Sequence, residues 1–463
     1  MQFNSMAPRT DGAVVRAFTW LLVASGFLFL GTVTALMDVD RRRLDQEMSM
    51  FPPGMAIAID MGNTNACVAG YNRGGSGTMF HLCIPSWVAF ADDGAVLVGE
   101  DAKNHAAVDP QAAIFGFKRL LGRRFNSVYD QEFVRRVAEN MPYKVVDKDM
   151  RPHVEVKTKD GVVRHLGMEQ LTTMVFAKLK EMAEAHHGRR VHAAFFTVPG
   201  HYVNIAPRHA VLYGSTYADL HTMRVLDEPI AAAIAYGLHE KLRDEGNVLV
   251  LHIGGGTAEA SVLTFVDGVF EFLGGDLDFF FGGDDFDQRI VDYFVELIQE
   301  KNGRDISNDN AALRKLRTAC EHAKKTLSNQ DHTQVNIESI VDGVDLSETL
   351  TRAKFEELCH DLFLKVIEMV DRVMLLAELE KNKNLVDEIV LIGGSTMIPK
   401  IRELVTDYFD GKELNTKLKP DESVALGAAL LSHPTANGYP CMGVNNRRQI
   451  GGPSDICYTY EYY

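Results

Sequence analysis

The feature that most constrains this chain is residues 247–265, with the sequence NVLVLHIGGGTAEASVLTF. The segment reads as an apolar strand, a triple-glycine turn and a second apolar strand. A glycine turn between two buried strands lets backbone N–H groups close on a phosphate, because no Cβ atom stands in the way. Residues 56–71, AIAIDMGNTNACVAGY, repeat this pattern weakly. Two such hairpins predict two similar α/β halves with a nucleotide held between them, since ligands often bind between lobes.

One residue fits this pattern poorly. His252 stands at the end of the first strand of the segment, where a phosphate site usually has a carboxylate that organises Mg²⁺ and its water. A neutral imidazole does not neutralise the metal, and a protonated imidazole repels it. The residues therefore predict a site that holds a nucleotide but hydrolyses it weakly or not at all.

Charge and cysteine content exclude several classes of protein. The 463-residue chain carries a net charge of −15 at pH 7, whereas binding of nucleic acid needs basic patches, so no nucleic-acid partner is expected. Its six cysteines form no Cys-x-x-Cys pair and no cluster with histidine, which argues against a metal knuckle. Separate buried thiols are the better interpretation, and Cys441 and Cys457 are the only pair for which a disulfide is plausible.

The N-terminal part contains an uncharged apolar run, residues 17–37, which follows Arg9 and Arg16. A run of this length could span a bilayer. It also resembles a secretory signal with a small-residue cleavage site that ends at Ala35. The run is longer than a usual signal core, which favours an uncleaved anchor; a buried core helix is the remaining alternative. Both membrane-linked interpretations place the chain in the secretory pathway, in the lumen or anchored at its membrane.

Turn signals and periodicity divide the chain into three parts. Residues 1–54 are a signal or anchor and a charged linker, residues 55–434 are the folded domain, and residues 435–463 are an irregular tail. Within the domain we expect a first lobe at about 55–241 and a second at about 242–434. The patterns predict helices at residues 101–108, 168–187, 231–240, 284–301, 311–328, 352–379 and 423–431. Strands are predicted within residues 55–90, 248–272, 335–344 and 388–392.

The chain resembles the seventy-kilodalton heat-shock chaperones, and most closely their branch in the endoplasmic-reticulum lumen. The resemblance covers about residues 55–434 and rests on ten motifs in the family's order, among them AIAIDMGNTNACV, VLDEPIAAAIAYGL, LHIGGGTAEASVL and DEIVLIGGSTMIPKI. It implies an α/β fold of the actin-like, ribonuclease-H-like type, with a nucleotide cleft between two lobes. It also implies ATP or ADP and Mg²⁺ as cofactors, and cochaperones or nucleotide-exchange factors as partners.

The resemblance assigns one set of residues to the phosphates and the metal. Asp60 would hold water on the metal, Glu259 would reach the metal through water, and Glu228 would couple nucleotide state to lobe motion. Lys118 would orient the attacking water and neutralise the γ-phosphate, which suits a transferring group whose charge spreads over its oxygens. The implied catalytic set is Lys118, Asp60, Glu228 and Thr257. The implied phosphate loops are Gly62, Asn63 and Thr64, and Gly254, Gly255, Gly256 and Thr257.

A second set is assigned to the nucleoside and to the loops beside it. Its members lie on a helix of the second lobe, on the loop before another helix and on the glycine loop near residue 394. They are Gly283, Glu321, Lys324, Lys325, Ser328, Gly393, Gly394, Ser395, Met397 and Asp421.

The departures from the family pattern concentrate at the chemistry. His252 replaces the second catalytic aspartate, and Glu259 replaces an aspartate with a longer side chain. Asn63 replaces a threonine beside the γ-phosphate. Met397 and Lys325 stand where two arginines would stack on adenine; lysine loses the planar stacking, while methionine still packs on a ring through its polarizable sulfur.

Three functions follow from this resemblance. The first is a nucleotide-binding member of the chaperone family, with a role in the stress response and weak or lost ATP hydrolysis. The second is an active ATPase that works with separate chaperone chains. The third is a non-catalytic module that competes for cochaperones. Because only about thirty residues follow Leu431, we expect no peptide-binding domain and no direct clamping of unfolded peptide. His252 favours the first function over the second, and the retained phosphate-loop residues favour it over the third.

Overall fold

The computed structural model describes residues 56–72, 78–139, 141–157, 162–200, 206–242, 245–266, 268–341 and 343–432. The predicted signal or anchor at residues 17–37, the charged linker, the tail, Cys441 and Cys457 lie outside these residues. Within the described ranges, no helix is both long and apolar enough to cross a membrane.

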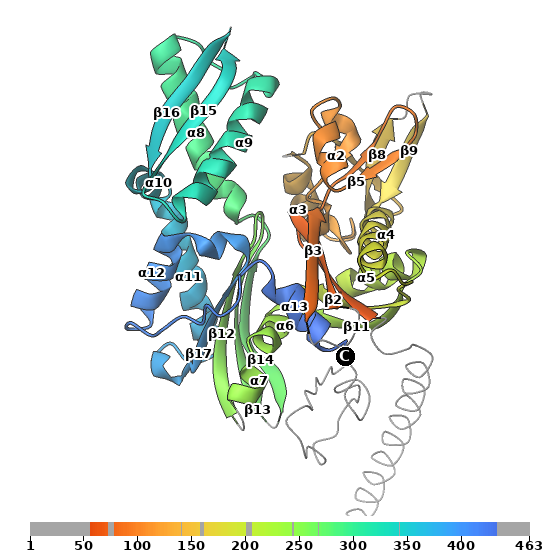
Figure 1. Cartoon of the computed structure of the whole chain (residues 1–463), viewed down its shortest axis with the longest axis vertical. Coiled ribbons are helices and arrows are strands. Elements are labelled where there is room, and N and C mark those ends of the chain that lie inside the picture. Colours follow the sequence, from red (N-terminus) through yellow and green to blue (C-terminus); the bar gives the residue numbers. More distant parts are fainter. Residues whose placement is uncertain are drawn as a thin grey trace, which may run out of the picture.

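Two lobes, each built on its own β-sheet, stand side by side (Figure 1). The first sheet has the order β11-β10-β1-β2-β3, in which β1 pairs parallel with β10 and antiparallel with β2. The second sheet has the order β14-β13-β12-β17, with the β12–β13 hairpin next to the parallel strand β17. The strands of the first sheet are β1 (Ala56–Met61), β2 (Asn65–Tyr71), β3 (Met79–Pro85), β10 (Ala193–Val198) and β11 (His221–Asp227). Those of the second are β12 (Glu245–Ile253), β13 (Ala258–Val266), β14 (Val269–Asp278) and β17 (Glu388–Ile392).

Helices cover both faces of the first sheet. On one face, α4 (Met168–His187) packs on β2 and on α5 (Ala206–Tyr217). Helix α4 begins after Gly167, whose N–H is accepted by Gln170 Oε1, and ends at Gly188, which adopts a left-handed conformation with φ 66°. On the other face lie α6 (Glu228–Ala235) and α13 (Ser423–Leu430).

Helices α6 and α13 join the two lobes. They pack on each other, and α13 also packs on β1, β2 and β10, although it comes last in the described sequence. Helix α6 in turn contacts β12 and β17 of the second sheet. One buried apolar cluster, which includes Ala232, Val250 and Ala428, runs through both sheets and both helices. The lobe boundary at residue 242 remains a prediction. Helix α13 belongs to the predicted second lobe by sequence, but it packs on the sheet of the first lobe.

The outer part of the first lobe consists of small sheets and short helices. Its strands are β4 (Val88–Phe90), β5 (Val96–Val98), β6 (Ala113–Ile114), β7 (Lys144–Lys148), β8 (Arg151–Lys157) and β9 (Val163–Gly167). Its helices are α2 (Glu100–His105), η1 (Pro110–Ala112), η2 (Phe117–Leu120) and α3 (Val128–Glu139), and α7 (Leu238–Lys241) follows α6 at the base.

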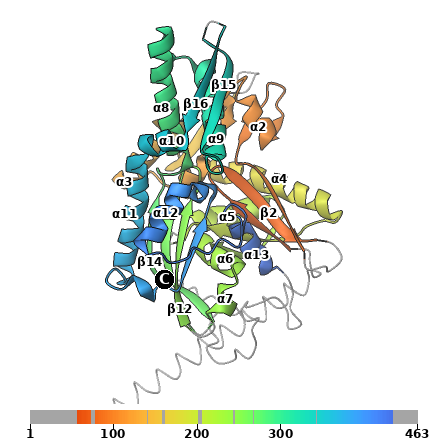
Figure 2. The same cartoon turned by 60° about the vertical axis from the view of Figure 1, so that its left-hand side comes forward.

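The outer part of the second lobe is a helical layer beside the hairpin of β15 (His332–Val341) and β16 (Val344–Thr351). Asp309 starts α9 (Asn310–Leu327) by accepting the N–H groups of Ala311 and Ala312, a standard N-cap. Helix α11 (His360–Leu376) lies along β13 and β14 (Figure 2). The remaining elements are α8 (Gly283–Asn302), α10 (Arg352–Leu358), η3 (Lys383–Leu385), η4 (Gly394–Met397) and α12 (Pro399–Tyr408).

The predicted α/β class is confirmed, and the helices predicted from strong periodicity lie close to α4, α8, α9 and α13. The predicted helix 352–379 is divided into α10 and α11 at Cys359. Helices α3, α5 and α12 and strands β5 to β11 were not predicted.

The expectation of separate thiols is wrong for one pair of cysteines. Cys67 on β2 and Cys83 on β3 form a disulfide. They stand directly opposite each other in the antiparallel ladder, which brings their side chains together despite a sequence separation of 16. Cys320 and Cys359 are free and buried, as expected.

Candidate functional site

The two glycine hairpins predicted from the sequence face each other across the lobes. In the first, Asp60 on β1 pairs with Cys67 on β2; in the second, His252 on β12 pairs with Glu259 on β13. Their turns approach so closely that a Cβ atom on Gly255 would lie 2.0 Å from Thr64 Oγ1. Residue 255 must therefore be glycine for the two turns to meet in this way.

A charged chain of three side chains lies beneath these turns. Lys118 Nζ, from η2, donates to Glu228 Oε1 at 2.8 Å. His252 Nδ1 lies 3.1 Å from Glu228 Oε2, so the two oxygens of one carboxylate face two different basic groups. Glu228 is buried because it opens α6, directly after the buried end of β11. The fold thus brings together residues from three distant segments of the sequence around one carboxylate.

The electrostatic interactions among Lys118, Glu228 and His252 favour the charged form of each side chain. Burial by itself would raise the pKa of Glu228, but Lys118 and His252 outweigh it and lower the pKa to about 2. Burial opposes the charge on His252, and the carboxylates of Glu228, Glu259 and Asp60 outweigh it and raise the pKa of the imidazole. The same competition, with Glu228 as the strongest partner, raises the pKa of Lys118.

The two carboxylates assigned to the metal are both held by neighbours. Asp60 Oδ1 accepts from Thr197 Oγ1 at 2.7 Å, and burial together with the charge of Glu228 raises its pKa. Glu259 Oε2 accepts the Gly200 N–H at 3.1 Å, and Glu259 Oε1 accepts from Ser261 Oγ at 2.8 Å. Burial and the charge of Glu228 raise the pKa of Glu259 to about 7.

A second cluster lies where the glycine loop meets α8, α9 and η4. Ser395 Oγ donates to the Gly254 carbonyl at 2.9 Å. Lys324 Nζ donates at 2.7 Å both to the Gly283 carbonyl and to Asp287 Oδ2, so this buried lysine ties α9 to the start of α8. Burial raises the pKa of the nearby Asp284 to about 6. The structure therefore brings together the assigned residues Gly254, Gly283, Lys324 and Ser395.

Other assigned residues lie at the edge of this cluster. Lys325 and Glu321 form an ion pair at 2.6 Å on α9, and Ser328 follows the end of the same helix. Met397 is half-buried at the end of η4, and Asp421 is exposed before α13. Gly393 has φ 83°, and a Cβ atom there would lie 2.4 Å from the Ile253 carbonyl, so this position requires glycine. Their assignment to a nucleoside remains a prediction.

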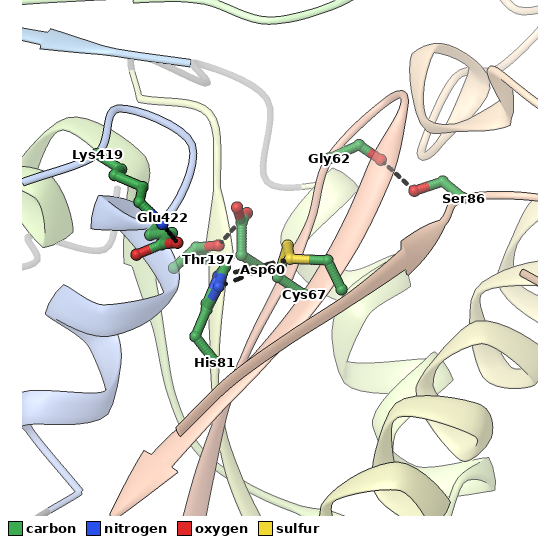
Figure 3. Close-up of a disulfide and its surroundings, with 9 residues drawn as sticks. Asp60, Gly62, Cys67, His81, Ser86, Thr197, Lys419 and Glu422 are labelled. Atoms are coloured by element: carbon green, nitrogen blue, oxygen red, sulfur yellow. Dashed lines mark hydrogen bonds and ion pairs between the residues drawn. A yellow bond between two sulfur atoms is a disulfide. The ribbon is translucent and has the colours of Figure 1, made fainter. Parts of the chain in front are cut away.

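Sequence reasoning missed three residues that shape the phosphate loops. Ser86 Oγ donates to the Gly62 carbonyl at 2.7 Å (Figure 3). The Ser86 N–H donates to the Thr64 carbonyl. Thr197 holds Asp60, and Arg119 Nη2 donates to the Gly256 carbonyl at 2.7 Å. Of these three residues, only Arg119 could have been suspected from the sequence, because it directly follows the assigned residue Lys118.

The residues present fit an anionic ligand better than they fit Mg²⁺. Arg119 Nε is a buried donor with no protein partner among the described residues, and it lies in a side chain that contacts the glycine turn. Such an orphaned donor suits a phosphate oxygen. The donor atoms of Glu228, His252 and Glu259 lie within 4.8 Å of one another, but a nitrogen replaces one oxygen in this set. Mg²⁺ prefers oxygen ligands, so His252 makes the set a poor one for it.

Comparisons with known proteins agree with this geometry. The family described as Hsp70 protein matches residues 56–436. The chain is 48% identical over 378 residues to the heat shock 70 kDa protein BIP3 of Oryza sativa subsp. japonica, in an alignment that covers 81% of this chain and 56% of the relative. It is 43% identical over 379 residues to a heat shock 70 kDa protein of Neurospora crassa, with 81% and 57% covered. The chain thus spans little more than half the length of these curated relatives.

Proposed function

This chain belongs to the Hsp70 protein family, and we propose that it binds ATP or ADP and hydrolyses ATP weakly or not at all. Its two-sheet α/β architecture is the actin-like nucleotide-binding domain of that family. The observation that carries the proposal is the contact of His252 Nδ1 with Glu228 Oε2 at 3.1 Å, at the centre of the predicted phosphate site.

Binding is supported by the positive groups at the two turns. Arg119 Nε is a buried donor without a protein partner, and Lys118 is charged beside Glu228. Gly255 lies so close to Thr64 that the two turns meet at one point, where their backbone N–H groups would close on a phosphate. Ser395 and Met397 on η4, and Gly393 just before it, would contact the nucleoside.

Weak hydrolysis is supported by the hydrogen bonds and ion pairs that the carboxylates of Glu228 and Glu259 already form within the protein. The oxygens of Glu228 face Lys118 and His252, and the oxygens of Glu259 accept from Gly200 and Ser261. A bound Mg²⁺ would supply charge neutralisation at the phosphates. The side chains that would orient its water shell are Asp60 and Glu259, which leaves one carboxylate fewer than the family pattern. Loss of a positioned acid–base group costs on the order of 10²–10⁴-fold in rate.

The proposal is tested by separating binding from turnover in the purified chain. We expect millimolar ATP and ADP to raise the melting temperature and to give a calorimetric binding signal, while single-turnover hydrolysis stays near the buffer rate. Nucleotide without effect on melting or heat would contradict binding. Turnover at the rate of an intact family member would contradict the catalytic part and would instead support an active ATPase that works with separate chaperone chains.

We also propose that the chain acts in the secretory pathway. The apolar run at residues 17–37 and the Cys67–Cys83 disulfide support this location, because disulfides persist mainly in oxidising compartments. Cochaperones or nucleotide-exchange factors are the partners that the family suggests. A fluorescent fusion that stays diffuse in the cytosol, without membrane association, would contradict the location.

A further inference from the structure

We propose that Cys67, Cys83 and His81 form a binding site for Zn²⁺ once a dithiol reductant has opened the disulfide. The three residues lie on one face of the antiparallel β2–β3 pair. None of the three donors is assigned to the nucleotide, although Asp60, which is, stands opposite Cys67 in the sheet. The proposal does not depend on the proposed nucleotide function.

The sheet register brings the three donors together. Cys67 stands opposite Cys83, and Ala69 stands opposite His81. Because side chains alternate between the faces of a strand, residues 81 and 83 project from the same face, as do residues 67 and 69. His81 therefore lies diagonally across from Cys67, within reach of a long side chain. Figure 3 shows the imidazole of His81 turned toward the disulfide.

The distances suit a tetrahedral cation. The donor atoms of Cys67, His81 and Cys83 all lie within 4.8 Å of one another, and His81 Nε2 lies 3.5 Å from Cys83 Sγ. Two ligands at about 2.3 Å (sulfur) and 2.0 Å (nitrogen) from a tetrahedral Zn²⁺ are separated by about 3.5 Å. The imidazole thus already stands at the required separation from one sulfur. Only the two sulfurs must move apart, which cleavage of their bond allows.

The surroundings give a cation access to the donors. Cys67 is buried, His81 is half-buried and Cys83 is exposed, so the donors form a site that opens to solvent on one side. Two thiolates and one imidazole match the ligands that zinc selects, with the fourth position left for water.

The conversion balances without any other reactant. A dithiol reductant gives two electrons and two protons to the Cys67–Cys83 bond; the protein disulfide becomes two thiols, and the reductant becomes a disulfide. Zn²⁺ then replaces the two thiol protons, which pass to solvent. Oxidation by a disulfide reverses the sequence and releases the metal. The disulfide and the zinc site therefore exclude each other.

The test uses the full chain, reduced with dithiothreitol and freed of it under anaerobic conditions. We expect Co²⁺ to bind with one equivalent per chain, with the absorption bands of tetrahedral thiolate coordination, and Zn²⁺ to displace it. The oxidised chain should show no such bands. Cys83→Ser should abolish them, and His81→Ala should weaken binding by about tenfold or more, since even the outer-shell partners of metal ligands account for 10–100-fold in affinity.

A matched control removes the two cysteines that lie outside the described residues. The double substitution Cys441→Ser and Cys457→Ser should leave the cobalt spectrum unchanged. Three results would overturn the proposal: no cobalt bands in the reduced chain, bands that survive Cys83→Ser, or a disulfide that dithiothreitol does not open while circular dichroism still reports the native fold.

Discussion

Glu228 Oε1 accepts a hydrogen bond from Lys118 Nζ at 2.8 Å, and Glu228 Oε2 lies 3.1 Å from His252 Nδ1. A single buried carboxylate is thus neutralised by two basic side chains of the same chain. The pairing explains how an imidazole is accommodated at the end of β12, where the family pattern places an aspartate. In the proposed nucleotide site, the same pairing leaves one carboxylate fewer for the metal than the family pattern has.

Replacing His252 by aspartate should restore part of the hydrolysis. The change returns an oxygen donor to the end of β12 and frees one oxygen of Glu228, which lies 3.1 Å from the imidazole. We expect His252→Asp, alone or with Glu259→Asp, to raise the single-turnover rate by at least about tenfold in the presence of Mg²⁺, against an expected total loss of 10²–10⁴-fold. His252→Asn is the matched control, since it has the same size without the charge. An equal rate in the aspartate and asparagine variants would contradict the role assigned to this position.

Nucleotide should stabilise the chain, and Met397→Arg should strengthen that effect. At a concentration one hundred times the dissociation constant, a ligand adds roughly 2.7 kcal/mol to the free energy of unfolding. Met397 ends η4 and is half-buried, and an arginine there would stack on the ring of the proposed adenine. Isothermal calorimetry should show a lower dissociation constant for ADP. Lys400→Arg, three residues further on, is the control and should leave the constant unchanged; an equal change in both variants would argue against stacking.

Stability of the ligand-free chain should fall as the pH rises above about 5. The pKa of Glu259 is raised from 4.5 to about 7 by burial and by the charge of Glu228, so the folded state holds this proton more tightly than the unfolded chain. Its contribution is complete below pH 4.5 and is lost as the pH rises toward 7. Glu259→Gln should therefore raise the melting temperature at pH 8 and change it little at pH 5. Glu300→Gln, at an exposed site on α8, should show no such pH dependence.

The aromatic contact between the lobes should contribute measurably to stability. Phe280, just after β14, lies 4.9 Å from the Phe133 ring on α3, and the Arg136 guanidinium lies 3.9 Å from the centre of the Phe280 ring. An aromatic pair contributes about 0.5–1.5 kcal/mol and a cation–π contact about 0.5–1 kcal/mol. Phe280→Ala should therefore lower the free energy of unfolding by about 1–2.5 kcal/mol in denaturant titrations. Val128→Ala, at an exposed site on α3, should change it by less than about 0.5 kcal/mol. A loss no larger than this control would mean that Phe280 does not hold the lobes together.

The sequence by itself determined the elements with strong periodicity and the two glycine hairpins. Helix α4 and strand β17 lie where their patterns predicted, because a long amphipathic or apolar run has only one way to bury its face. The motifs also determined the family, since their order along the chain does not depend on packing. Weakly periodic segments such as α3 and α5 were missed, because tertiary contacts with Phe279, Phe280 and α4 support them rather than local propensity.

Only the tertiary structure decided which side chains meet. Nothing in the spacing of Lys118, Glu228 and His252 shows that they share one carboxylate, because the three come from η2, α6 and β12. The disulfide depends in the same way on strand register: a shift of one residue between β2 and β3 would place Cys67 and Cys83 on opposite faces. Sequence patterns report how a segment buries its own surface, whereas pairing across the sheet and between the lobes is fixed by the fold as a whole.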